Sequence, residues 1–186
     1  MPDPRTQQGD HVDEVLAQWA AAFPAADTAP VAVIARLGRV TAYVDAAVNE
    51  RLARFGLTRA SWDVLASLRR MGPPHRLSPT QLYVALMRTS GAMTHRLAAL
   101  ERAGLVRRIP DPHDGRGALV ELTRKGRALV DRVAPAHLDN ERALLAALGD
   151  DERDALARLL RKLLVAFERE QPAPPPSGTG GRRRAR

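Results

Sequence analysis

The side chains of this chain that could do chemistry are mostly cationic and lie close together in the sequence. Residues 88–127 hold nine basic residues against four acidic ones, a net charge of +5. The nine are Arg88, Arg96, Arg102, Arg107, Arg108, Arg116, Arg124, Lys125 and Arg127. Such a cluster favours a polyanionic partner, because phosphates that bind basic side chains release their counterions and so supply affinity. On the net charge of the chain alone, which is +8, a solvated basic surface without a partner remains an equal alternative.

The residue types of catalytic and metal sites are scattered. The five histidines form no His-x-x-x-His or carboxylate–histidine cluster with metal-ligand spacing, and no phosphate-binding glycine loop or Gly-x-Ser-x-Gly elbow occurs. His113 lies between Asp111 and Asp114, where a turn is a simpler interpretation than a metal site. The chain has no cysteine, which excludes disulfides and thiolate chemistry within it. We therefore expect no enzyme activity, no metal and no cofactor.

Two short helices are expected to position the middle of the basic segment. Ser78 can cap the first, with Pro79 at its first position, where the missing N–H costs little. After a turn at 87–89, Ser90 can cap a second helix that ends at Gly104 and whose core side chains repeat every three or four residues. The pair forms a helix-turn-helix. The second helix presents small or hydrogen-bonding outward positions that could enter a major groove, namely Gly91, Thr94, His95 and Ala98.

A hairpin is expected directly after the second helix. Residues 106–109 and 118–122 are rich in β-branched and aliphatic side chains and read as strands, with a polar loop over 110–117. The tip of the hairpin is basic and contains glycine. A helix-turn-helix followed by a two-stranded β wing is the arrangement of a winged helix, which we predict here within a mostly α fold.

The remaining helices flank this DNA-reading part. We expect a short amphipathic helix over 12–23, a long helix over 31–54, a helix capped by Thr58 or Ser61, and a helix from Thr123 to about Leu148 that is bent or interrupted at Pro135. The last helix begins with acids at 150–152 and carries a broad apolar stripe that a small domain is unable to bury alone. The stripe comprises Leu156, Leu159, Leu160, Leu163, Leu164 and Phe167. The N- and C-terminal helices are therefore expected to form a dimerisation region.

The domain boundaries follow from composition. Residues 1–30 form an N-terminal extension, 31–170 a winged helix domain with its DNA-reading part at 58–123 and dimerisation helices at 31–54 and 123–170, and 171–186 a disordered basic tail. The start of the chain lacks an apolar signal core, and no apolar run is long enough to cross a membrane. We expect a cytoplasmic protein with no membrane partner.

One long segment resembles the helix-turn-helix and wing of the MarR family of transcriptional regulators. It reads SPTQLYVALMRTSGAMTHRLAALERAGLVRRIPDPHDGRGALVELTRKGRALV. The family's wing motif Asp-x-Arg is matched by Asp114-Gly115-Arg116, and its Leu-Thr-x-x-Gly by Leu122 to Gly126. The resemblance implies a homodimer that binds a pseudopalindromic operator in double-stranded DNA. It also implies that Arg116 contacts phosphates or the minor groove while Asp114 orients it. Arg88 and Ser90 join the expected DNA contacts.

A narrower resemblance is to the urate-responsive MarR subgroup, which has an extra N-terminal helix bearing a tryptophan. Trp19, Asp63, Arg96 and Arg108 match the residue types that this subgroup places in its ligand site and its coupling path. This implies a regulator, typically a repressor, that a small aromatic anion such as urate releases from its operator. Two alternatives stay open: Trp19 is a core residue and Asp63–Arg96 a structural ion pair, or the chain is a constitutive or architectural DNA-binding protein without a ligand.

Overall fold

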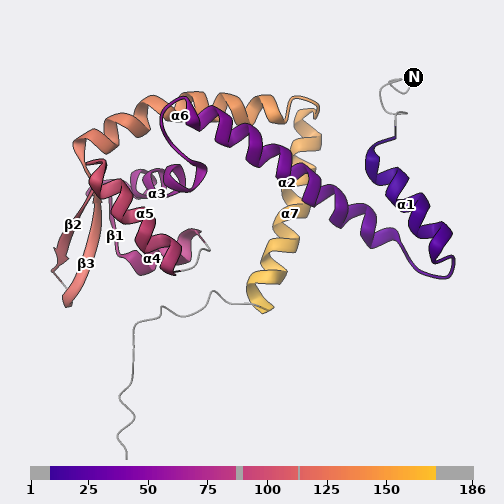
Figure 1. Cartoon of the computed structure of the whole chain (residues 1–186), viewed down its shortest axis with the longest axis horizontal. Helices are drawn as coiled ribbons and strands as arrows, with labels where there is room; N and C mark the ends of the chain where they lie inside the picture. The colour runs from indigo at the N-terminus through magenta and orange to yellow at the C-terminus, as the bar shows by residue number, and fades with distance from the viewer. Residues whose placement is uncertain (1–8, 87–89, 113, 171–186) are drawn as a thin grey trace, which may run out of the picture. The chain divides into compact units, whose positions relative to one another are not determined.

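The computed structural model describes residues 9–86, 90–112 and 114–170. The chain divides into two compact units, residues 1–47 and 48–186, and the long helix α2 (Ala29–Ala53) contributes to both. The described residues form seven helices and three short strands (Figure 1), which confirms the predicted mostly α class. No helix among them is both long enough and apolar enough to span a bilayer.

The first unit holds α1 (His11–Ala22) and the beginning of α2, and one arginine joins them. Asp10 caps α1 by accepting the N–H of Val12 at 2.7 Å, and the Asp13 carboxylate accepts the N–H of Asp10 at 2.7 Å. Arg36 of α2 donates to both carboxylates, at 2.8 Å to Asp10 and 2.6 Å to Asp13. The hydrogen bond from Arg36 holds the pKa of Asp10 below its usual range. The helix predicted over 12–23 is thus present and attached.

The second unit is built around α3 (Arg59–Arg70), which contacts α4, α5, α6 and β3. Thr58 caps α3 through the N–H of Ser61, which settles the choice between the two predicted caps. The inward face of α3 is fully buried because Val64, Leu65 and Leu68 fall on one side of the helix. Helices α4 (Pro79–Leu86) and α5 (Ser90–Arg102) follow, as the sequence predicts.

The ends of α4 and α5 follow local sequence rules with one difference. Ser78 and Gln81 form a reciprocal capping box at α4, with bonds of 3.1 Å and 2.8 Å. The predicted cap Ser90 is instead the first residue of α5. At the other end, Gly104 has a φ of +70°, and the N–H of Leu105 donates to the carbonyl of Leu100 at 3.0 Å. This is the left-handed helix end that favours glycine.

The sheet is larger than the predicted hairpin. Strands β1 (Arg76–Leu77), β3 (Asp114–Leu122) and β2 (Val106–Asp111) lie antiparallel in the order β1-β3-β2. Strand β1 is not predicted from the sequence. The loop predicted over 110–117 is wrong in its bounds, because β2 extends to Asp111 and β3 begins at Asp114. β2 is an edge strand, where Pro110 fits because its missing N–H would face away from the partner strand.

Two long helices complete the second unit. Thr123 caps α6 (Arg124–Leu144) by accepting the N–H of Gly126 at 3.0 Å. The helix runs through Pro135 without interruption and ends before the predicted Leu148; Pro135 is solvent-exposed, so water can reach the carbonyl that its ring leaves unpaired. α7 (Asp150–Glu170) begins at the predicted acids but has no buried residue in the chain as described.

Candidate nucleic-acid interface

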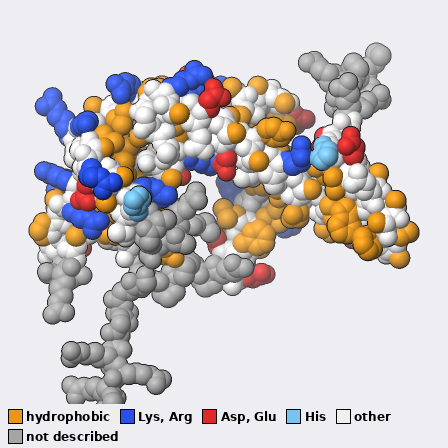
Figure 2. Space-filling model, in the orientation of Figure 1, with side chains coloured by type: hydrophobic (Ala, Val, Ile, Leu, Met, Phe, Trp, Pro, Cys, Tyr) orange, Lys and Arg blue, Asp and Glu red, His pale blue; other side chains and the backbone are white. Residues whose placement is uncertain are grey.

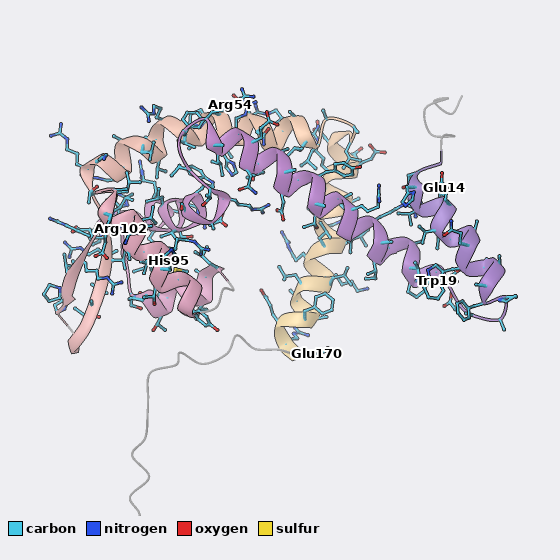
Figure 3. The ribbon with its side chains drawn as sticks, in the orientation of Figure 1. Glu14, Trp19, Arg54, His95, Arg102 and Glu170 are labelled. Carbon is cyan, nitrogen blue, oxygen red and sulfur yellow. The ribbon has the colours of Figure 1, made fainter. Side chains whose placement is uncertain are left out.

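Helices α4 and α5 form a helix-turn-helix whose inner side is tightly packed. Leu82 of α4 and Met93, Leu97 and Leu100 of α5 are all buried. The same spacing leaves Thr94 and His95 exposed and Ala98 half-exposed on the outer side of α5. Figure 3 shows His95 and Arg102 projecting from this helix. The outer side of α5 therefore offers hydrogen-bonding groups without a bulky hydrophobic side chain between them.

The predicted DNA-contacting residues fall into three groups. Thr94, His95 and Ala98 lie on the outer side of α5. Ser90 and Gly91 belong to its first turn, and Asp114 and Arg116 to the first residues of β3, next to the hairpin tip at Asp111. Arg88 lies outside the described residues. The backbone thus brings the expected helix and wing positions into one unit of the structure.

A buried carboxylate at the base of the wing holds its strands together, and it is not predicted from the sequence. Glu121 of β3 stands opposite Arg76 of β1 and Arg107 of β2 in the strand register. It accepts hydrogen bonds from both, on Oε1 from Arg76 at 3.1 Å and on Oε2 from Arg107. Both bonds lower the pKa of Glu121, that of Arg107 above all, and the hydrogen bond to Glu121 in turn raises the pKa of Arg107. The row of three charges crosses the whole sheet and holds the hairpin to β1.

A second set of contacts joins the C-terminal end of α5 to the start of α6. The Thr123 hydroxyl donates to the carbonyl of Gly104 at 2.8 Å, and the Lys125 ammonium donates to the carbonyl of Ala103 at 2.8 Å. Arg108 of β2 donates to Glu101 of α5 at 3.2 Å. Helix α5, the wing and α6 are therefore connected through one small region, and a displacement of one of them would shift the other two.

Positive charge gathers around this region. Figure 2 shows Lys and Arg side chains clustered over α5, the wing and the start of α6. Arg102, Arg107, Arg108, Arg124 and Arg127 are all exposed. The arrangement can bind a polyanion and can place an exposed helix side against it. These are the physical requirements of DNA binding by a winged helix.

A separate hollow of about 450 Å³ lies between α3, the end of α4 and α6. Asp63, one of the predicted ligand residues, lines it, together with Arg69, Arg70, His137 and Glu141. Its apolar wall includes the buried Trp62, whose ring meets His137 edge-on with centroids 5.0 Å apart. The Nδ1 atom of His137 is buried and has no hydrogen-bond partner among the described residues. The volume and the mixed lining are typical of small-molecule sites.

The other three predicted ligand residues have different surroundings. Arg96 is half-buried on α5, and Arg108 is engaged with Glu101. Neither is among the described residues that line the hollow. Trp19 belongs to the first unit, is 44% exposed and packs on Phe23 with ring centroids 5.2 Å apart. Sequence reasoning missed Trp62 and His137 because a tryptophan at helical spacing and a lone histidine carry no signal that they will meet.

Fold and site together define a winged helix-turn-helix protein. The MarR family model matches residues 55–117, which cover the helix-turn-helix and most of the wing. The HTH-type transcriptional regulator PecS of Dickeya dadantii is 37% identical over 152 residues, covering 82% of this chain and 92% of PecS. The chain therefore belongs to the MarR family. It is a DNA-binding transcriptional regulator and not an enzyme.

Solved structures agree with this assignment. A mutant MarR from Escherichia coli complexed with operator DNA is 30% identical, with a TM-score of 0.66, covering 78% of this chain and 97% of that one. BpsR of Bordetella bronchiseptica, whose DNA binding is regulated by 6-hydroxynicotinic acid, is 29% identical, with a TM-score of 0.65, covering 70% of this chain and 91% of that one.

Proposed function

We propose that the chain acts as a homodimeric repressor that binds a pseudopalindromic operator and leaves it when a small aromatic anion binds. The observation that carries the DNA-binding part is the exposed side of α5 at Thr94 and His95, in the same unit as a basic wing. In a two-fold dimer the two α5 helices would enter major grooves about one helical turn, or roughly 10 bp, apart. The mutant MarR bound to operator DNA supports this role by its similarity in fold.

The wing is proposed to contact the DNA backbone through Arg116, near the tip of the hairpin. Replacing Arg116 by Ala should weaken binding to all sequences and reduce the slope of log K against log salt by about one, because one phosphate contact releases about one counterion. Fluorescence anisotropy over a salt series measures both quantities. Arg132→Gln, which removes the same charge from an exposed position on α6, is the control and should leave the slope nearly unchanged. An unchanged slope for Arg116→Ala would overturn the wing contact.

The ligand part of the proposal is supported by the hollow beside Asp63. Arg70 can attract an anion, and the Trp62 face of the wall is apolar and aromatic. Arg69 and His137 already contact carboxylates, Asp131 at 2.8 Å and Glu141 at 3.2 Å, so an anion would have to compete for them. A planar anion such as urate combines both properties, and 6-hydroxynicotinic acid, which regulates BpsR, is a planar aromatic acid as well. An anion bound near Asp63 would repel its carboxylate, so that α3 would shift relative to α5, where we expect Arg96 to pass the change to the DNA-reading side. Trp19 and Arg108 do not line the hollow, and their part in ligand binding stays a prediction from the sequence.

Titrating urate or 6-hydroxynicotinate into the operator complex should therefore dissociate it, and operator DNA should weaken ligand binding by the same factor. Tryptophan fluorescence reports binding to the DNA-free protein. Trp19→Phe and Trp62→Phe separate the two possible reporters. If Trp19→Phe loses the fluorescence quench, Trp19 is supported as the stacking residue. If only Trp62→Phe loses it, the ligand binds in the hollow and Trp19 does not contact it. Asp63→Asn should bind the anion but release DNA less readily. If neither compound binds the protein or dissociates the operator complex, the result favours a constitutive DNA-binding protein without a ligand.

A further inference from the structure

A second hollow, of about 390 Å³, lies where the loop before β1, the base of the wing and the start of α6 meet. Among the described residues, none assigned to DNA reading or to the aromatic ligand lines it. The residues that matter for its chemistry are His75, Arg107, Glu121, Thr123, Arg124 and Arg127. Three of these six are arginines, brought from two different elements, and the cap residue of α6 is among them.

His75 lines this hollow with a buried ring nitrogen that the described part of the fold leaves without a hydrogen bond. It is only 6% exposed, and its backbone is fully used: its N–H donates to the carbonyl of Gly72 at 2.7 Å and its carbonyl accepts the N–H of Leu122 at 3.1 Å. The ring Nδ1, by contrast, is buried and has no hydrogen-bond partner among the described residues. Leaving a buried polar atom unsatisfied costs about 1–3 kcal/mol, so such atoms are normally paired with water, an ion or a ligand.

The charges around His75 indicate the sign of the missing partner. Glu121 is the one acidic residue lining the hollow within the described part of the chain, and both its oxygens are already bound, one by Arg76 and one by Arg107. Arg124 and Arg127 form no ion pair with any described residue. The first turn of the 21-residue helix α6 adds the positive end of its dipole at the same place. An anion here would meet the guanidinium groups of Arg124 and Arg127 and a helix N-terminus.

We propose that this hollow binds an oxyanion, that is a phosphate or carboxylate group, between His75, Arg124 and Arg127. The Nδ1–H of His75 would donate to one oxygen, and the two guanidinium groups would bind the others. The group can be a free anion or a backbone phosphate of bound DNA, and the chemistry of the site is the same for both. Because the hollow touches the base of the wing and the start of α6, the bound anion would brace the wing. This site does not depend on the proposed aromatic ligand.

The first arm of the test uses inorganic phosphate and the DNA-free protein. In a HEPES buffer at constant ionic strength, replacing chloride by phosphate should raise the Tm by roughly 3 °C once phosphate is in tenfold excess over its Kd. The variant Arg124→Gln/Arg127→Gln should lose this rise, and Arg132→Gln on the same helix should keep it. The ring resonances of His75 in an NMR titration should shift with phosphate, while those of the four other histidines serve as internal references.

The second arm uses operator DNA and identifies the source of the oxyanion. If phosphate has no effect on the free protein but Arg124→Gln/Arg127→Gln lowers operator affinity and the salt slope more than Arg132→Gln does, the bound group is a DNA phosphate. If the phosphate effect is present and operator affinity is unchanged relative to Arg132→Gln, the site takes a free anion. The proposal is overturned if the double variant behaves like Arg132→Gln in both arms and the His75 resonances do not move.

Discussion

Replacing Leu163 by Asp is expected to convert the protein from a dimer to a monomer and to lower operator affinity by at least about 100-fold, because two linked half-site contacts become two separate ones. Leu163 lies on the apolar stripe of α7, which has no buried residue in the described chain. Large hydrophobic side chains exposed side by side on a helix mark an interaction surface. An Asp in the middle of this surface would be desolvated without a partner in the dimer. Sedimentation velocity and operator anisotropy measure the two effects.

The same helix supplies a closely matched control. Val165 is 40% exposed against 42% for Leu163, but two residues along a helix place it on the opposite face. Val165→Asp makes the same kind of change two residues further along α7, and it should leave both the dimer and operator binding nearly intact. Circular dichroism should show equal helix content in the two variants. A dimer that persists in Leu163→Asp, or dissociates equally in both, would show that α7 is not the interface.

Local signals in the sequence were sufficient for most helix boundaries. Thr58, Ser78 and Thr123 each cap the helix they were expected to cap, since a hydroxyl that accepts an N–H three residues on needs no tertiary contact. Gly104 ends α5 for a similarly local reason, its left-handed φ. The apolar repeat of α5 also fixed which side of the helix is buried, and therefore which side can face DNA.

What the sequence did not reveal depends on partners that are distant along the chain. β1 is two residues long and follows two prolines, so it has no periodicity of its own and exists only because β3 pairs with it. Glu121 is one more acid in a basic segment until the register places Arg76 and Arg107 on either side of it. Likewise His137 meets Trp62 across 75 positions of sequence, and His75 reaches the start of α6 only in the folded unit.

The Leu-Thr-x-x-Gly motif at 122–126 combines a local helix cap with a contact that is distant along the chain. Substitution of its glycine is expected to destabilise the protein strongly. Gly126 is buried in the first turn of α6, although glycine within a helix costs roughly 0.5–1 kcal/mol relative to Ala. A Cβ at this position would overlap the carbonyl oxygen of Leu105 and lie 2.8 Å from Cδ1 of Leu122. The Leu105 carbonyl already accepts the N–H of Thr123 at 3.1 Å, so it is held in place at the junction of α5, wing and α6.

Gly126→Ala should therefore destabilise the protein by about 2–3 kcal/mol, because either the Leu105 backbone or the start of α6 has to move. This corresponds to a fall in Tm of about 5–10 °C, measured by calorimetry. Operator affinity should fall even well below the Tm, since the displaced junction sets the angle between α5 and the wing. Gly38→Ala, in a helical position of α2 with nothing within 4 Å of the added Cβ, is the control and should raise stability by about 0.5–1 kcal/mol. If Gly126→Ala were as stable as the native chain, the close approach to Leu105 would not be what requires glycine in this motif.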